Sequence, residues 1–197
     1  MSIRKKMAVY LILVLFVLVV MATVIVLASS SQRINSNITI SYTATQIAGR
    51  VTATYMIGDG AEQSMVASDD SSNKEFVFDA SDTPLTGSLV PSESSIVLET
   101  GQEMVIKYTF FNRGGYPYYA VLSYTDTNSD DANIAFSYKK NESDEYSTTL
   151  PSSLEVPAMS GDIEGSATFL VKISIPNPKL DAILTGSFNW NMTKQSS

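Results

Sequence analysis

The sequence contains neither cysteine nor histidine among its 197 residues. Without cysteine the chain can form no disulfide, no thiolate zinc site, no cysteine nucleophile and no iron–sulfur cluster of its own. Without histidine it lacks the commonest general base, which excludes Ser-His-Asp hydrolysis and HExxH metalloprotease chemistry. These absences argue against an enzyme.

Positive charge is scarce and unevenly placed. The 13 lysine and arginine residues compare with 20 aspartates and glutamates. Three of the basic residues, Arg4, Lys5 and Lys6, precede the apolar run at residues 8–28, and the first acidic residue is Asp59. From residue 31 onward, 10 basic residues therefore stand against 20 acidic ones. A domain this acidic repels nucleic acid and anionic lipid, so we expect no nucleic acid partner.

One long uncharged apolar run occupies residues 8–28. As a helix it would be about 32 Å long, enough to cross the apolar core of a bilayer. The basic residues in 1–7 predict a cytoplasmic N-terminus, with the bulk of the chain outside. The run is longer than the core of a typical signal peptide, which favours a single transmembrane anchor, but small residues also permit cleavage near Ser29–Ser31. Both alternatives make the rest of the chain extracytoplasmic, either membrane-anchored or secreted.

Beyond a polar linker at residues 29–36, apolar and polar residues alternate with period two. The polar ranges 61–74 and 141–157 are expected to be loops. Short strands with turn residues between them predict an all-β, antiparallel two-sheet sandwich over residues 37–197, jelly-roll-like or immunoglobulin-like, behind one N-terminal hydrophobic helix. Strands are expected at 38–44, 51–57, 76–78, 96–98, 104–110, 118–124, 134–138, 167–175 and 184–190, and the last two show the clearest alternation.

Three sequence features resemble those of a known family. A long export segment is followed at once by an alternating strand, residues 98–112 read LETGQEMVIKYTFFN, and strand 167–175 is followed by GSFNW at 186–190. Together they resemble the TasA/camelysin family of exported bacterial fibre proteins, over about half of the exported part. The resemblance implies a jelly-roll-like sandwich in biofilm-matrix or cell-surface fibres, in which the N-terminal strand of one subunit completes the sheet of the next. Some relatives are described as metalloproteases, against which the lack of histidine and cysteine argues.

The first expected strand has a pattern suited to assembly. Ile38, Ile40 and Tyr42 alternate with threonine and serine in a strand that follows a polar linker. Such a strand can pair within its own sheet, or with the open edge of a neighbouring subunit, which would grow a filament. Both arrangements stay open at this point.

Alternating oxygen ligands suggest a calcium loop. Asp126, Asn128 and Asp130 are spaced as in the first half of such a loop. However, Asp131 stands where a glycine is required, and Ser137 replaces the bidentate glutamate. An Asx-rich turn is the alternative, and calcium is the only cofactor that the sequence suggests.

A cluster of tyrosines follows two glycines at residues 116–119. Clustered tyrosine suits carbohydrate stacking or a protein interface, which makes Tyr116 and Tyr119 candidate contacts for a glycan or a surface protein. Alternatively, Tyr118 enters the core while the other two pack at the end of a sheet.

These patterns predict a non-enzymatic structural protein of the cell surface or matrix, which assembles into fibres through its N-terminal strand. The alternative is a monomeric, membrane-anchored β-sandwich that acts as an adhesion module.

Overall fold

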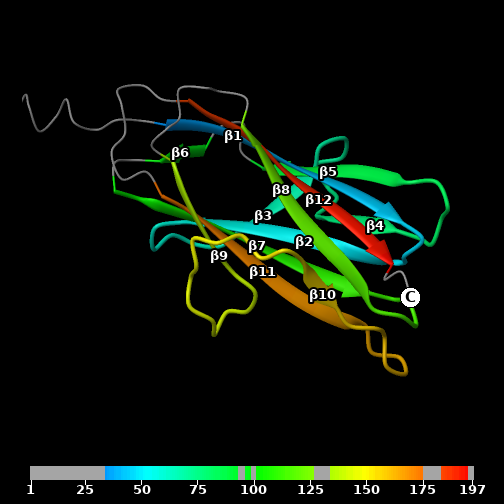
Figure 1. The fold of residues 1–197 in the computed structure, drawn as a ribbon. Helices are drawn as coiled ribbons and strands as arrows, with labels where there is room; N and C mark the ends of the chain where they lie inside the picture. Colours follow the sequence, from blue (N-terminus) through cyan, green and yellow to red (C-terminus); the bar gives the residue numbers. More distant parts are fainter. Residues whose placement is uncertain (1–33, 93–95, 99–100, 127–133, 175–182, 195–197) are drawn as a thin grey trace, which may run out of the picture. The chain divides into compact units, whose positions relative to one another are not determined.

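The structure is a computed structural model that describes residues 34–92, 96–98, 101–126, 134–174 and 183–194 (Figure 1). This part of the chain contains twelve strands and no helix, so the expected all-β class is confirmed. The helix expected at residues 8–28 lies outside the described residues. The strands are β1 (Ile34–Thr45), β2 (Gly49–Ile57), β3 (Gln63–Ala67), β4 (Glu75–Phe78), β5 (Leu85–Pro91), β6 (Ile96–Leu98), β7 (Glu103–Asn112), β8 (Tyr118–Asp126), β9 (Ala135–Lys139), β10 (Leu154–Val156), β11 (Gly165–Ser174) and β12 (Ile183–Lys194).

The strands form one curled sheet in the order β10-β8-β12-β1-β5-β3-β2-β7-β11-β9, with β4 attached to β2 and β6 to β1. β3 joins the two halves of this sheet because it pairs with β5 on one side and with β2 on the other. The expected loop at 61–74 is therefore wrong in part, since it contains this joining strand. Its burial does not alternate, because Met65, Val66 and Ala67 are all buried at the bend between the two halves.

The sheet is mixed, which corrects the expectation of purely antiparallel strands. β1 and β12 run parallel, in register from Asn35↔Ile183 to Thr45↔Thr193. The other strand pairs of the described part are antiparallel. An alternating pattern fixes which side chains face the core, but it carries no information on the direction of the neighbouring strand.

Aromatic side chains join the two halves of the curled sheet. Trp190 of β12 is 2% exposed, as its place in the alternation predicts. Its ring centroid lies 5.2 Å from that of Tyr108 and 4.8 Å from that of Phe110, both on β7, and 5.2 Å from that of Phe169 on β11. These edge-to-face contacts are favourable beyond the area they bury. β12 thus packs across the core against β7 and β11.

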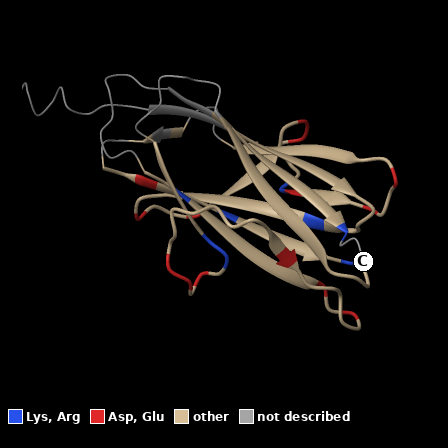
Figure 2. Ribbon diagram, in the orientation of Figure 1, with Lys and Arg blue, Asp and Glu red and all other residues tan. Residues whose placement is uncertain are grey.

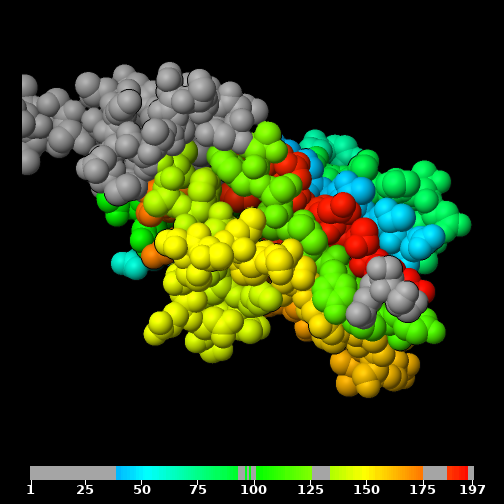
Figure 3. All heavy atoms as spheres, viewed as in Figure 1, coloured from blue at the N-terminus to red at the C-terminus, as the bar shows by residue number. Residues whose placement is uncertain are grey.

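Three neighbouring strands of one half carry little charge. β1, β5 and β12 contain a single charged residue, Lys194, and the parts of their ribbons that Figure 2 does not draw grey are otherwise tan. On the other half, lysine and arginine side chains of β2, β7 and β11 form ion pairs with glutamates. The loop between β9 and β10 protrudes beside this half (yellow in Figure 3).

Candidate functional site

β1 occupies an interior position in the sheet, between β12 and β5. Ile40 is 0% exposed and Tyr42 is 1% exposed, so both side chains lie in the core of the chain's own domain. The Tyr42 ring stacks on that of Phe76 with centroids 5.6 Å apart. Ile38 pairs with Gly186 in the parallel register. The candidate interface residues therefore line a sheet position that has a neighbour on each side.

Residues 46–48 connect β1 to β2. Gln46 has a φ of 57°, and no other non-glycine residue of the described part has a positive φ. A left-handed conformation costs an L-residue roughly 1–2 kcal/mol. The Gln46 N–H donates to the Ser81 carbonyl at 2.8 Å, and its side-chain amide donates to Asp82 Oδ1 at 2.8 Å. These two hydrogen bonds to a neighbouring loop keep Gln46 in its strained left-handed conformation.

The turn before β8 places Tyr116 outside the core. Buried Asn112 donates from Nδ2 to the Tyr116 carbonyl at 2.9 Å, and its Oδ1 accepts from the Gly114 N–H at 2.7 Å. These bonds close the turn and leave Tyr116 70% exposed. Tyr118 is buried, which agrees with the alternative that this residue enters the core. Its burial raises the pKa of its hydroxyl.

Tyr119 lies apart from Tyr116. It is opposite Glu155 of β10, and its hydroxyl donates to Glu155 Oε2 at 3.3 Å. Partial burial and the Glu155 carboxylate raise the pKa of Tyr119. Within the described part of the chain, no ring contact joins the two tyrosines. They do not form a single stacking platform.

A pocket of about 180 Å³ opens beside Tyr116, and we call it the Tyr116 pocket. Gln46 lines it from the β1–β2 connection, Gly115 from the turn and Lys194 from the end of β12. The Lys194 ammonium lies 4.6 Å from the centroid of the Tyr116 ring, which is a cation–π distance. The pocket therefore brings together a cation, an exposed aromatic ring and an amide from three distant parts of the chain.

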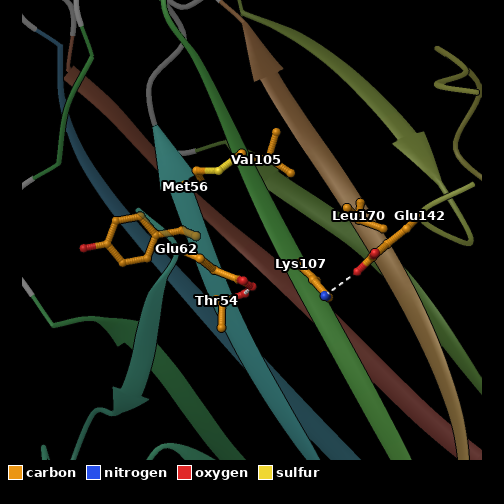
Figure 4. Close-up of a pocket in the computed structure, with 8 residues that line it drawn as sticks. Thr54, Met56, Glu62, Val105, Lys107, Glu142 and Leu170 are labelled. Atoms are coloured by element: carbon orange, nitrogen blue, oxygen red, sulfur yellow. Dashed lines mark hydrogen bonds and ion pairs between the residues drawn. The ribbon is translucent and has the colours of Figure 1, made fainter. Parts of the chain in front are cut away.

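A second pocket, of about 140 Å³, lies over β2, β7 and β11 (Figure 4). Lys107 points toward Glu142 of the β9–β10 loop and forms an ion pair with it, while the Thr54 hydroxyl donates to Glu62. The hydrogen bond to Glu142 raises the pKa of Lys107 and lowers that of Glu142. Lys107 is therefore a charged ammonium that is held by its ion pair with Glu142.

Ion pairs also tie the Asn112–Tyr116 turn to the sheet. Glu164 accepts from Arg50 Nη2 at 3.0 Å and from Arg113 Nε at 2.7 Å, and Arg50 also pairs with Glu75 at 3.1 Å. Arg113 contributes most to lowering the pKa of Glu164, followed by Arg50. The two arginines and the two glutamates of this network are therefore paired with one another.

The calcium hypothesis falls mostly outside the described residues. Asp126 ends β8, whereas Asn128 and Asp130 belong to 127–133 and lie outside the described part. In the ranges that the structure describes, no group of three or more acidic residues could hold a metal ion. The calcium site stays a prediction.

No protein-family model matches the chain, and no curated protein matches it significantly. Among the described residues, no helix has the length and apolar character needed to cross a bilayer. The TasA/camelysin resemblance and the membrane anchor or signal segment at 8–28 stay predictions.

The sequence analysis did not single out Gln46 or Lys194. A positive φ at glutamine leaves no mark in sequence. Lys194 reaches Tyr116 because β12 runs antiparallel to β8, with Lys194 opposite Tyr118. The only available signal was that Lys194 ends an otherwise uncharged strand.

Proposed function

We propose that the protein is an exported, non-enzymatic structural protein of the cell surface or extracellular matrix, which assembles into fibres by exchanging β1. The position of β1 carries the proposal. It is the first described strand, it begins at Ile34 inside the range expected as a linker (residues 29–36), and it fills a slot between β12 and β5. The β1 strand of a second copy would make the same contacts in that slot. Head-to-tail exchange of this kind does not close, so it grows a filament.

The connection after β1 supports this proposal. A short hinge under strain favours domain swapping, because opening the hinge releases the strain. Gln46 is such a strained residue, with its φ of 57°. In the exchanged form the hinge straightens and Gln46 adopts an ordinary extended conformation.

The outer strands of the sheet path offer little room for assembly by simple edge addition. β10 at one end spans only Leu154–Val156. β9 at the other end is partly covered by its own loop, since Tyr138 and Ser147 exchange backbone hydrogen bonds at 2.8 and 2.9 Å. Short or covered edges are the usual protection against strand addition. Assembly by exchange of β1 would instead use the β1–β12 ladder, which is the longest between two strands of the described part.

The proposal includes the jelly-roll-like sandwich and the export segment that the TasA/camelysin resemblance implies. The packing of β12 against β7 and β11 supports a two-layer arrangement. The export segment supplies the route to the cell surface, either as an anchor or as a cleaved signal.

Deletion of residues 37–45, followed by electron microscopy, tests the proposal. The full chain is expected to form filaments as its concentration rises, and the deleted chain none. A synthetic peptide of residues 34–45 is expected to restore the near-ultraviolet signal of buried Trp190 in the deleted chain without restoring filaments. This rescue separates loss of assembly from loss of folding. Filaments formed by the deleted chain would overturn the proposal.

A monomeric binding module is the second candidate, and the exposure of Tyr116 beside a pocket favours it. This candidate predicts a stable monomer at all concentrations that loses its ligand on substitution of Tyr116.

A further inference from the structure

Small residues make up much of the lining of the Tyr116 pocket. Ala48, Ala80, Gly114 and Gly115 all line it, so much of its surface is backbone and small side chains. A Cβ added at Gly115 would meet no atom within 4 Å. The pocket is smaller than the roughly 300–1,000 Å³ typical of sites for drug-sized ligands. Its volume of about 180 Å³ therefore suits a ligand with one small ring.

Two side chains at the pocket, those of Tyr116 and Lys194, are available to contact a ligand. Tyr116 is the most exposed aromatic residue of the described part, at 70%. Lys194 has no carboxylate partner among the described residues, whereas several other cations are paired with glutamates: Arg50, Lys107, Arg113 and Lys172. The Tyr116 ring holds the Lys194 ammonium at 4.6 Å, so the cation is positioned before any ligand arrives.

The remaining polar groups suit hydroxyls better than a second negative charge. The Gln46 amide nitrogen is engaged by Asp82, which leaves the amide oxygen as an acceptor at the pocket. Asp82, which accepts from the Gln46 amide, adds a negative charge near this wall and disfavours a ligand with more than one carboxylate. An exposed aromatic ring beside hydrogen-bonding groups is suited to the apolar face of a sugar.

We propose that the Tyr116 pocket binds a single carboxylated sugar ring, free or at the end of a polymer. Lys194 pairs with the carboxylate, Tyr116 stacks on the ring, and Gln46 accepts from a hydroxyl. This inference concerns the unexchanged chain, because exchange of β1 would straighten the hinge that contains Gln46. Binding by the unexchanged chain together with an absence of filaments would contradict only the proposed function, and an unexchanged chain that binds no sugar would contradict only this inference.

Titration of the full-length protein in detergent micelles tests the inference, followed by amide chemical shifts of Gly114 and Gly115. The probes are sodium glucuronate, glucose and sodium acetate. Glucuronate is expected to bind at least fivefold more tightly than either of the other two. Lys194→Gln should remove the preference for glucuronate over glucose, while Tyr116→Ala should weaken both sugars.

Two variants keep the test interpretable. Gly115→Leu fills the open space and is expected to abolish binding while the amide spectrum of the core stays unchanged. Lys140→Gln, an exposed lysine of the β9–β10 loop, is the matched control and should leave binding unchanged.

Three results would overturn the inference. The first is no binding of glucuronate at millimolar concentration. The second is equal affinity for glucose, which removes the role of Lys194. The third is equal affinity for acetate, which reduces the pocket to a simple anion site.

Discussion

At the scale of single residues, the buried tyrosines differ in whether their hydroxyls are satisfied. The Tyr55 hydroxyl donates to Gln63 Oε1 at 3.1 Å. The Tyr42 hydroxyl is buried and finds no hydrogen-bond partner among the described residues. Burial, and to a lesser extent Tyr108, raises the pKa of Tyr42, so the phenol stays neutral. A buried polar group without a partner costs about 1–3 kcal/mol.

We therefore predict opposite effects for two matched substitutions. Tyr42→Phe removes an unsatisfied hydroxyl and should raise the free energy of unfolding by about 1–3 kcal/mol. Tyr55→Phe removes a satisfied one and should lower it by about 0.5–1.5 kcal/mol. Urea unfolding followed by Trp190 fluorescence measures both. A loss of stability in Tyr42→Phe would show that an ordered water or another group satisfies this hydroxyl.

Glu164 gives a prediction on pH. Arg113 and Arg50 hold its pKa below the ordinary value of 4.5. A depressed pKa contributes stability that is complete above the unfolded pKa and is lost as the pH falls through the folded pKa. Glu164→Gln should therefore reduce stability near neutral pH and flatten its decline below about pH 4.5. The check is urea unfolding across this range.

The matched control for this prediction is Glu145→Gln, which changes an exposed loop carboxylate without an ion pair in the described part. It should leave the pH profile as in the parent chain. An unchanged profile in Glu164→Gln would show that the ion-pair network contributes nothing to stability.

At the scale of elements, alternation located the strands that keep one face in the core. β2 and β7 follow a strict period of buried and less buried residues, and their ranges were predicted nearly in full. β3, β5 and β10 were missed for different reasons. β3 is buried without alternation, β5 contains Gly87 and ends at Pro91, and β10 is only three residues long.

The candidate site was predicted less completely than the strands. Tyr116 and Tyr119 stood out as a cluster, but the turn directs them to different surroundings. Their partners, Lys194 and Glu155, come from strands whose neighbours depend on the order of the whole sheet. Local pattern cannot supply that order, because it arises from long-range pairing.

The hinge after β1 makes a prediction at this scale. Gln46→Gly removes the strain of the left-handed conformation in the unexchanged chain, worth roughly 1–2 kcal/mol. The exchanged fraction should then fall by about 5–30-fold. Gln46→Ala is the control, because it loses the hydrogen bond to Asp82 but keeps the strain. Sedimentation velocity on the two variants measures the difference, and an equal fall in both would show that strain is irrelevant.

At the scale of the whole molecule, charge opposes assembly. The formal net charge is −7, and from residue 31 onward 10 basic residues stand against 20 acidic ones. Copies of the chain therefore repel one another over about 10 Å at 0.1 M salt and over about 3 Å at 1 M. Filament growth, followed by light scattering, should accelerate with salt. A slower growth would show that opposite charges, rather than strand exchange, drive association.

The central claim is that β1 of one copy pairs with β12 of another. Thr43 and Asn191 are partners in the parallel register, and the chain has no cysteine of its own. In the Thr43→Cys, Asn191→Cys double variant, a short thiol crosslinker therefore reports only this contact. Exchange predicts a ladder of covalent oligomers on a denaturing gel of the filaments. Monomers with an internal crosslink, and no ladder, would contradict the account.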